Sequence, residues 1–243
     1  MPNKSYYFMV RNMSFYIGLS LLSNSWHKSK NGQLSLKAES RRILSCLEGR
    51  PLTEGEIARD EKGRPFLPES PGDFNISHSG AIAAVSLATG NALHTGIDVQ
   101  ITRPRLSARE IAEAFFTSPE RAYIFSSRSA QMEKSRFFEI WALKECFLKL
   151  RGLSVFDMAS VPSFIDAGGR HFAFGEAVPL PLSFYLYRLE GQPGECYTLA
   201  AAIEGNEQPS PEIRWFSQSF LPCRSIAKIK AALSPAKTVK PKM

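Results

Sequence analysis

The stretch FFEIWALKECFLK, Phe137–Lys149, has the pattern of a helix with one buried side. Apolar residues recur at helical spacing, and good helix formers fill the positions between them. Glu145 and Lys149 are four residues apart, so they are neighbours on the surface of this helix. Trp141 falls on the same side as Glu145, which places the carboxylate at the edge of the apolar face. A solvated pair with Lys149 is the simple interpretation, and a metal ion is the alternative partner for a carboxylate partly withdrawn from water.

The segments that follow this helix are predicted to be strands. The helix is expected over about residues 131–150, and Arg151-Gly152 ends it because glycine is a common C-cap. Four runs with the composition of strands come next, and Gly191-Gln192-Pro193-Gly194 joins the last two as a hairpin. These runs are residues 161–165, 170–174, 184–190 and 197–204.

An alternating segment, His94–Ile101, precedes the helix and is predicted to be a strand. Ile97 and Val99 point to one side, and Asp98 and Gln100 point to the other. Such a strand is most often half exposed. Aspartate is a poor strand former, however, so the position of Asp98 between β-branched residues needs a structural or functional reason.

The rest of the chain supplies further elements. A buried first strand is expected over Phe15–Leu22, and Ser35 is expected to cap a helix that ends at Gly49. Two other helix starts are Ser107, in a capping box, and Ser118, followed by proline. The remaining expectations are a hairpin of residues 57–59 and 64–67, a segment rich in turn-forming polar side chains at residues 74–80, and a strand or helix at residues 81–88.

Both ends of the chain carry weak patterns. Residues 1–14 are interpreted as an extension, and Met13 is a candidate natural start. A signal peptide that ends near Trp26 is the alternative, which the short and interrupted apolar run makes less favoured. Beyond Gly205 we predict a weakly patterned, basic tail, disordered from about Ser234.

Composition limits the classes of partner. The 243 residues carry a net charge of +7, which favours anionic partners such as a phosphorylated metabolite, an acidic protein or nucleic acid. The four cysteines form no CxxC pair, which argues against a zinc site or a disulfide framework and suits a reducing compartment. No run approaches about 18 apolar residues, so we expect no membrane span and a cytoplasmic protein.

Four motifs occur in order along the chain: Gly63-Arg64-Pro65, Phe74-Asn75-Ile76-Ser77-His78-Ser79, Gly96-Ile97-Asp98-Val99 and Trp141-x-x-Lys144-Glu145-x-x-x-Lys149. Together they resemble the 4′-phosphopantetheinyl transferases, in particular the larger, surfactin-synthetase-activating (Sfp-like) type. The resemblance covers about residues 57–165, and the first fifty residues and the tail carry no matching motif.

The resemblance implies an activity. Such enzymes move the 4′-phosphopantetheine arm of coenzyme A to a serine of an apo acyl or peptidyl carrier protein, use Mg²⁺ and release 3′,5′-ADP. Asp98 and Glu145 match the metal ligands of the family, and both are oxygen donors that suit Mg²⁺. Glu145 is also the expected acceptor of the serine proton. Lys149 matches the lysine beside the phosphates and completes the expected catalytic set with Asp98 and Glu145.

The same comparison implies a coenzyme-binding set. Ser77 and His78 match residues that contact the phosphates of coenzyme A. Arg64 takes the place of a lysine, and its guanidinium can hold a phosphate bidentately. Lys144 precedes the glutamate as in the family and is expected to face the coenzyme or solvent. With Lys149, these residues form the predicted coenzyme site.

Two departures from the family pattern matter. The third metal ligand is commonly a glutamate, and this chain has Gln100, whose amide oxygen could ligate the metal directly or hold a water. The connection from Lys149 to Leu153-Ser154 is also shorter than usual. We expect an active enzyme with weaker metal binding, and an altered choice of carrier or acyl group.

The resemblance also implies the fold. We expect an α+β protein in which two similar halves, related by a pseudo-twofold axis, each pack a long helix on a small antiparallel sheet. The expected boundaries are residues 1–14 for the extension, 15–96 and 97–205 for the halves, and 206–243 for the tail. Because both half-sites lie in one chain, a monomer is expected, with coenzyme A in the cleft between the halves.

Two other functions are open at this point. A basic nucleic-acid-binding protein fits the charge, but no nucleic-acid motif is present, so we expect no such partner. A catalytically silent relative that binds coenzyme A or a carrier protein is supported only by Gln100. The presence of Asp98, Glu145 and Lys149 favours the enzyme.

Overall fold

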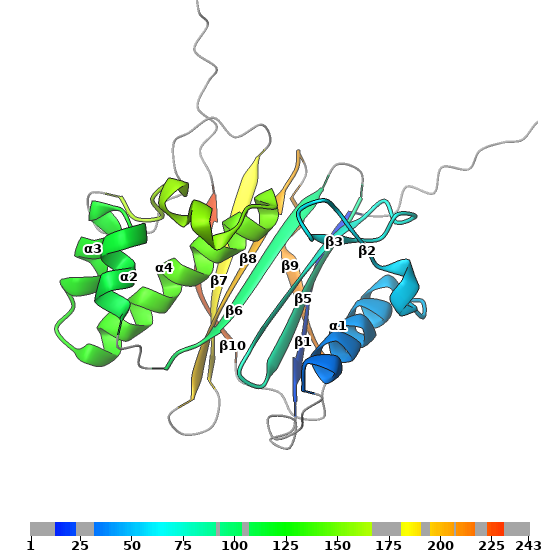
Figure 1. The fold of residues 1–243 in the computed structure, drawn as a ribbon, viewed down its shortest axis with the longest axis horizontal. Helices are drawn as coiled ribbons and strands as arrows, with labels where there is room; N and C mark the ends of the chain where they lie inside the picture. The colour runs from blue at the N-terminus through cyan, green and yellow to red at the C-terminus, as the bar shows by residue number, and fades with distance from the viewer. Residues whose placement is uncertain are drawn as a thin grey trace, which may run out of the picture.

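Two four-stranded sheets form the centre of the molecule, and a long helix covers the outer side of each (Figure 1). The computed structural model describes residues 13–22, 32–90, 93–103, 107–166, 181–190, 195–206, 208–216 and 223–230. Helix α1, the first sheet, the second sheet and helix α4 follow one another across the view of Figure 1. The mixed α+β class predicted from the sequence is therefore confirmed.

The first sheet has the strand order β4-β5-β1-β9. Strand β9 runs parallel to β1, whereas the other neighbours are antiparallel, so this sheet is not the purely antiparallel sheet that was expected. The strands are β1 (Ser14–Leu21), β4 (Asp73–Ser79), β5 (Ile82–Thr89) and β9 (Pro211–Trp215). A separate two-stranded hairpin, as predicted, consists of β2 (Ala58–Arg59) and β3 (Pro65–Phe66).

The second sheet has the order β10-β7-β8-β6 and is antiparallel throughout. Its strands are β6 (His94–Ile101), β7 (Leu182–Glu190), β8 (Cys196–Glu204) and β10 (Cys223–Lys230). The expected boundary between residues 96 and 97 falls inside β6. Within the expected tail, the described residues 211–215 and 223–230 are strands β9 and β10, which extend the two sheets at their edges.

The helices cover opposite sides of this pair of sheets. Helix α1 (Gly32–Glu48) packs on the first sheet through the predicted apolar side chains Leu36, Ile43, Leu44 and Leu47. It begins before Ser35, so that serine is not the cap. Helix α4 (Ala130–Arg151) packs on β6 and β8, and α2 (Ala108–Phe115) and α3 (Ser118–Phe125) lie against its other side. Two 3-10 helices are η2 (Glu54–Glu56) and η3 (Val155–Ser160).

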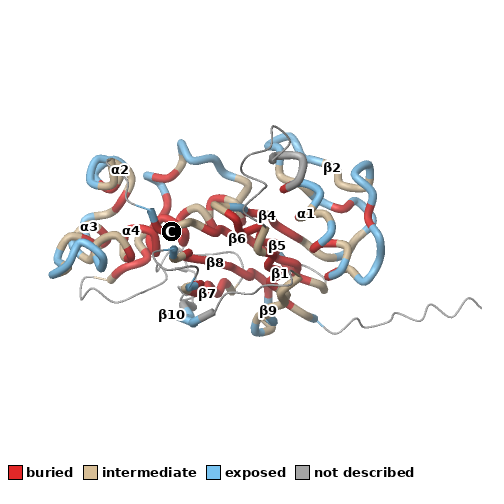
Figure 2. The backbone as a smooth tube through the Cα atoms, turned by 90° about the horizontal axis from the view of Figure 1, so that it is seen from below, coloured by how far each residue is buried: buried red, intermediate tan, exposed pale blue. Residues whose placement is uncertain are grey.

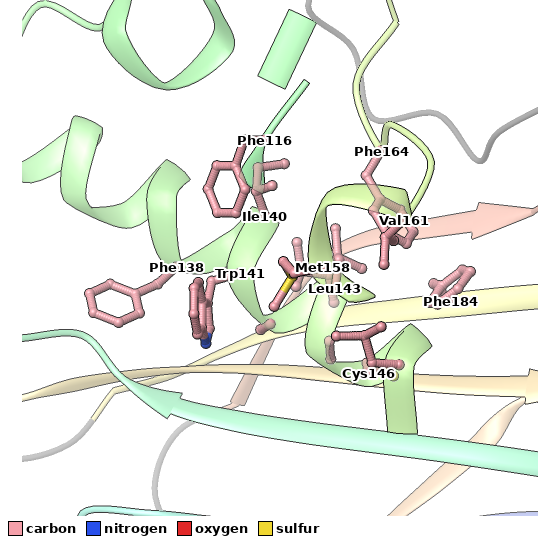
Figure 3. Close-up of a cluster of buried hydrophobic side chains, with 14 of the residues drawn as sticks. Phe116, Phe138, Ile140, Trp141, Leu143, Cys146, Met158, Val161, Phe164 and Phe184 are labelled. Carbon is pink, nitrogen blue, oxygen red and sulfur yellow. The ribbon is translucent and has the colours of Figure 1, made fainter. Parts of the chain in front are cut away.

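Three apolar clusters hold these layers together. One lies under α1, and a second fills the space between the two sheets with side chains from both, including Phe15 and Val99. The third joins α4 to α2, α3 and the second sheet, and it contains Trp141 and Phe164 (Figure 3). In Figure 2 the middle of α4 and most of the central strands are coloured as buried. The predicted buried side of the 137–149 helix is thus confirmed.

The helix ends follow the predicted chemistry in part. Gly152 ends α4 in the left-handed conformation with φ 61°, as glycine allows. Ser107 is the N-cap of α2, but its side chain makes no capping bond. Thr117, not Ser118, caps α3, and it forms a capping box with Glu120.

Two other expectations need correction, and three fall outside the described residues. Residues 74–80 were described as turn-forming, yet residues 73–79 are a strand. Residues 161–165 were predicted as a strand, yet they are irregular apart from a bridge at Ile165. The predicted strand 170–174 and the tail from Ser234 lie outside the described residues, as does the chain before Met13.

No helix in the part of the chain that the structure describes combines the length and the apolar character needed to cross a membrane.

Candidate functional site

Side chains of β4 join the two sheets. Strands β4 and β6 are the edge strands of their sheets, so backbone N–H groups on the outer side of β6 have no partner in their own sheet. Side-chain oxygens of alternate β4 residues accept these N–H groups at a constant offset of 22 residues, which makes the two strands parallel. The pairs are Thr95 to Asp73 (2.8 Å), Ile97 to Asn75 (3.4 Å), Val99 to Ser77 (3.2 Å) and Ile101 to Ser79 (2.9 Å). We call this set the β4–β6 joint.

This joint explains why residues 73–79 form a strand although they are rich in turn-forming side chains. Alternate side chains of a strand point to the same side, so Asp73, Asn75, Ser77 and Ser79 can all face β6. Each satisfies a backbone donor that would otherwise be left unpaired between the sheets.

Asp98 lies in the middle of β6 and is almost completely buried, with 1% of its surface exposed. Three donors surround its carboxylate. Ser77 donates to Oδ1 over 2.9 Å, the Lys149 ammonium donates to the same oxygen over 2.7 Å, and the Gln100 amide donates to Oδ2 over 2.9 Å. The buried charge is therefore both hydrogen-bonded and paired, as a carboxylate in the interior requires.

Ser77 connects Asp98 with Lys149. Its hydroxyl donates to Asp98 and accepts from the Val99 N–H and from Lys149 Nζ, the latter over 2.9 Å. A hydroxyl has one donor and two acceptor positions, so its hydrogen-bonding capacity is fully used. In this arrangement Ser77 has no donor left for the phosphate contact that the sequence predicts.

Gly96 brings helix α4 to this strand. A Cβ atom on Gly96 would lie 2.5 Å from the carbonyl oxygen of Cys146 and 3.0 Å from Cβ of Leu150. Only glycine therefore allows the close approach that sets Lys149 beside Asp98. Glu145 lies one turn before Lys149 on α4 and is half-buried.

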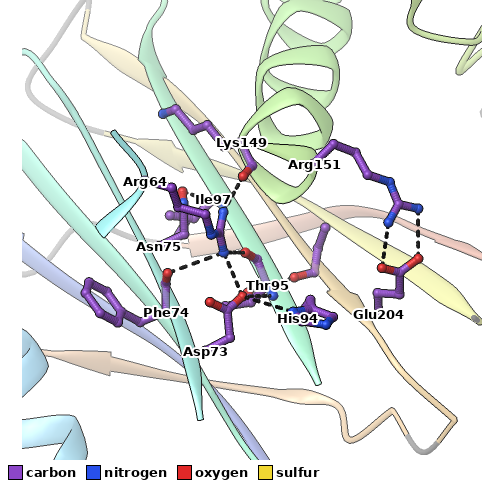
Figure 4. Close-up of polar contacts among 11 residues, drawn as sticks. Arg64, Asp73, Phe74, Asn75, His94, Thr95, Ile97, Lys149, Arg151 and Glu204 are labelled. Carbon is purple, nitrogen blue, oxygen red and sulfur yellow. Dashed lines mark hydrogen bonds and ion pairs between the residues drawn. The ribbon is translucent and has the colours of Figure 1, made fainter. Parts of the chain in front are cut away.

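Arg64 fastens the β2–β3 hairpin to the same region. Its guanidinium donates to Asp73 Oδ2 over 2.6 Å, to the carbonyl of Thr95 over 2.8 Å and to the carbonyl of Lys149 (Figure 4). The contact with Lys149 places a positive charge at the C-terminal end of α4, where the helix dipole favours it. The predicted coenzyme ligand Arg64 thus contacts protein oxygens here.

A second clamp holds the C-terminal end of α4. Arg151 donates to both carboxylate oxygens of the buried Glu204, over 2.6 and 2.7 Å (Figure 4). This bidentate pair ties the last turn of α4 to the end of β8. The last turn of α4 is therefore held by Arg64 at the Lys149 carbonyl and by Arg151 two residues later, while the Lys149 side chain remains 28% exposed.

Two neighbouring cavities open beside this cluster. The first, of about 590 Å³, is lined by Lys62, Arg64 and Lys149, and by Leu153 and Ser154 after α4. The second, of about 450 Å³, is lined by Lys37, Arg41, Arg59 and His78, with apolar walls from Leu36 and Ile57. They share Pro65 and Ile76. Cationic side chains from α1, the hairpin and α4 thus line two adjacent cavities, which suits a polyanionic ligand with an apolar part.

His78 stands at the rim of the second cavity and is exposed. Partial burial and the nearby Lys149 ammonium lower the pKa of His78 below its ordinary value, and the charge of Asp98 opposes this shift. The ring therefore favours its neutral form, in which it can accept a hydrogen bond.

Lys144 does not lie in the site, and the prediction that it faces coenzyme or solvent is wrong. Its side chain is completely buried, with Nζ 2.9 Å from the carbonyl oxygen of Val161 and 3.3 Å from Glu120. Glu120 also accepts the N–H of Phe164 over 2.9 Å. Burial lowers the pKa of Lys144, and the Glu120 carboxylate opposes this effect. These side chains bind the Val161 carbonyl and the Phe164 N–H, two backbone groups that a strand would use for pairing.

The donors present suit a hard divalent cation. Among the described residues, no three His, Cys, Asp or Glu side chains are grouped to hold a metal. Mg²⁺ commonly needs only one or two carboxylates, however, because phosphate and water supply the rest. Asp98 already faces a positive group, the Lys149 ammonium, so this position accepts a cation. Asp98, Glu145 and Gln100 supply oxygen donors of the required kind.

Comparison with known proteins addresses the same part of the chain. Residues 94–199, which include Asp98, Glu145 and Lys149, match the model of the 4′-phosphopantetheinyl transferase superfamily. Over these residues the chain is similar to members of that superfamily. Asp98 on β6 and Lys149 on α4, which pair in the structure, both fall within the matched residues.

Three relatives illustrate the similarity to superfamily members. The 4′-phosphopantetheinyl transferase AcpT of Escherichia coli (strain K12) is 38% identical over 109 residues, which are 44% of this chain and 54% of the relative. The transferase psf-1 of Bacillus pumilus is 31% identical over 118 residues, 47% of each chain. The 4′-phosphopantetheinyl transferase of Bacillus subtilis is 31% identical over 93 residues, 38% of this chain and 39% of the relative. The chain spans about half the length of the curated relatives it matches.

Several residues of the site had no role assigned from the sequence. Asp73, Thr95 and Gly96 hold the two halves and α4 together, and Glu120 anchors Lys144. The signal for Asp73 was the alternation of polar side chains over residues 73–79. The signal for Glu120 was its place three residues after Thr117, but nothing local indicated that it also meets Lys144.

Proposed function

We propose that the protein transfers the 4′-phosphopantetheine arm of coenzyme A to a serine of an apo acyl or peptidyl carrier protein and releases 3′,5′-ADP. The observation that carries this proposal is the buried Asp98 paired with Lys149, a lysine that also lines a cavity of about 590 Å³; both residues lie within the segment that matches the superfamily. Polar and cationic groups at one edge of a cavity are what a pyrophosphate substrate requires.

Each group has a proposed part in this reaction. The cationic side chains Lys37, Arg41 and Arg59 at the second cavity, with Lys149 at the first, hold the phosphates of coenzyme A. His78 contributes a neutral hydrogen-bonding ring at the rim. Asp98, Glu145 and Gln100 would hold Mg²⁺, which when bound neutralises charge on the pyrophosphate.

The bond changes involve the serine, the coenzyme and one carboxylate. The serine oxygen forms a bond to the β-phosphorus of coenzyme A, and the bond from this phosphorus to the bridging oxygen of the pyrophosphate breaks. The electron pair leaves with 3′,5′-ADP, and Glu145 takes the serine proton. Lys149 places its positive charge where negative charge develops on the phosphates.

The remaining expectations belong to the same proposal. The partners are coenzyme A and an apo carrier protein, and the net charge of +7 favours an acidic carrier. We propose no nucleic-acid partner, a monomer in the cytoplasm, and an approximate twofold relation between the half with α1 and the half with α4. Each of these halves has one long helix on a four-stranded sheet, which supports that relation.

A transfer assay tests the function. The protein is mixed with Mg²⁺, coenzyme A and apo carrier proteins of the fatty-acid, polyketide and peptide-synthetase types, and each carrier is weighed by mass spectrometry. We expect at least one carrier to gain a phosphopantetheine group. No gain on any carrier would refute the proposal.

Glu145→Gln tests the role of the carboxylate. Loss of a ligand charge and of the proton acceptor should lower the transfer rate by about 10²-fold or more. Glu113→Gln on α2 removes an equally charged, exposed carboxylate and should leave the rate unchanged. Full transfer by Glu145→Gln would show that another group accepts the proton.

A further inference from the structure

The Lys149 ammonium occupies one side of Asp98. Its hydrogen bond to Oδ1 is the shortest of the three to this carboxylate, at 2.7 Å. Of the three donors, only the ammonium brings a positive charge. The carboxylate is almost fully buried, so solvent screens the interaction little. The negative charge of Asp98 is thus paired with a positive charge within the protein.

Lys149 also belongs to the wall of the first cavity. Its side chain is partly exposed there, whereas Ser77 and Gln100, the other donors to Asp98, do not line the cavity. A lysine carries its charge on a flexible four-carbon stem. The ammonium can therefore leave Asp98 for an anion in the cavity while two donors stay on the carboxylate and the backbone of α4 stays fixed by Arg64 and Gly96.

We infer that Lys149 takes the place of the divalent cation at Asp98 when no coenzyme is bound, so that metal and coenzyme A bind cooperatively. This inference rests on the proposed function. Without coenzyme, a divalent ion at Asp98 meets the ammonium at close range and is repelled. The pyrophosphate of coenzyme A offers the ammonium a new partner and leaves the carboxylate to the metal. Because coupling is reciprocal, metal also strengthens coenzyme binding.

Titration with Mn²⁺ tests the inference without any carrier or turnover. Binding is measured by calorimetry, with the Mn²⁺ affinity of free coenzyme A taken into account. Wild type should bind Mn²⁺ weakly alone and about tenfold more tightly with coenzyme A. Lys149→Met, which removes the ammonium, should bind Mn²⁺ alone about tenfold more tightly than wild type, and coenzyme A should add little.

Three further variants make the test specific. Lys62→Met removes an equal charge from the same cavity at an exposed residue, and it should bind Mn²⁺ alone as wild type does. Lys149→Gln removes the charge but keeps a hydrogen-bond donor for Asp98, so it replaces Lys149→Met in the titration if that variant fails to fold. Adding Asp98→Asn to either Lys149 variant should remove the tight Mn²⁺ binding.

The outcomes separate this inference from the proposed function. The inference is wrong if both Lys149 variants bind Mn²⁺ only as tightly as wild type and Lys62→Met. This holds even if carriers are modified. If the Lys149 variants bind Mn²⁺ more tightly but no carrier is modified by wild type, the cation exchange stands and the proposed function fails.

Discussion

At the scale of single residues, the site depends on how each buried polar group is satisfied. The sequence identified Asp98 correctly as a residue out of place in a strand. It could not identify the donors, because Ser77 and Lys149 come from other elements and meet Asp98 only in the fold. Lys144 was misplaced for the same reason. A lysine next to Glu145 gives no sign in the sequence that Glu120, on another helix, will bury it.

His78 provides a residue-scale prediction on pH. Burial first, and then the Lys149 ammonium, lower its pKa. In Lys149→Met the second cause is lost, so the pKa of His78 should rise relative to wild type, as NMR titration of the ring can show. Lys62→Met should leave it near the wild-type value. A pKa that is unchanged in Lys149→Met would contradict the proximity of the two groups.

The same shift has a consequence for stability. The folded chain resists protonation of His78, so the unfolded chain binds this proton at higher pH. The contribution of His78 to the free energy of unfolding therefore falls as the pH drops through about 6.5. Urea unfolding at pH 7.5 and at pH 5.5 should show a smaller loss in Lys149→Met than in wild type, where the shift is larger.

At the scale of elements, the pair of Lys144 with Glu120 connects α3, α4 and residues 161–164. Both side chains are completely buried. Glu120→Gln leaves the Lys144 ammonium without a counter-charge, so we expect the free energy of unfolding to fall by about 3–5 kcal/mol in chemical denaturation. Adding Lys144→Met should recover much of this loss. Glu113→Gln is the matched control on α2, and a loss for Glu120→Gln no larger than the control's would contradict the role of the pair.

Hydrophobic periodicity in the sequence predicts some of these elements and not others. The strands of residues 94–101 and 197–204 and the helices α1 and α4 follow from periodicity, because an apolar face decides them. The segment 73–79 does not, because its polar side chains serve another strand instead of solvent or a turn. Strands β9 and β10 lie at sheet edges, and their sequences lack the strong pattern of a strand buried on both faces.

At the scale of the whole molecule, the β4–β6 joint holds the two halves together. Ser77→Ala removes the acceptor of the Val99 N–H, and Ser79→Ala removes the acceptor of the Ile101 N–H. Each should lower the free energy of unfolding by about 1–3 kcal/mol, since a donor between the sheets loses its partner. The hydrogen bond from the joint to Asp98 comes from Ser77 and not from Ser79, so Ser79→Ala is the control for effects on the site.

Hydrogen exchange followed by NMR checks these changes one amide at a time. The Val99 amide should exchange faster in Ser77→Ala, and the Ile101 amide should exchange faster in Ser79→Ala, each with little effect on the other. Wild-type protection of Val99 in Ser77→Ala would mean that another group accepts this N–H and that the joint does not depend on the serine.

The joint differs from an ordinary sheet in one respect that bears on how such a protein can change. Hydrogen bonds between two backbones do not depend on which side chains are present. Here, in contrast, one partner of each bond is a side chain, which a substitution can remove. Single amino-acid substitutions at these positions can therefore loosen or tighten the attachment of one half to the other without altering the path of either strand. Variation at four alternate positions is enough to adjust how firmly the two halves are coupled, and at Ser77, which also contacts Asp98 and Lys149, it would change the site at the same time.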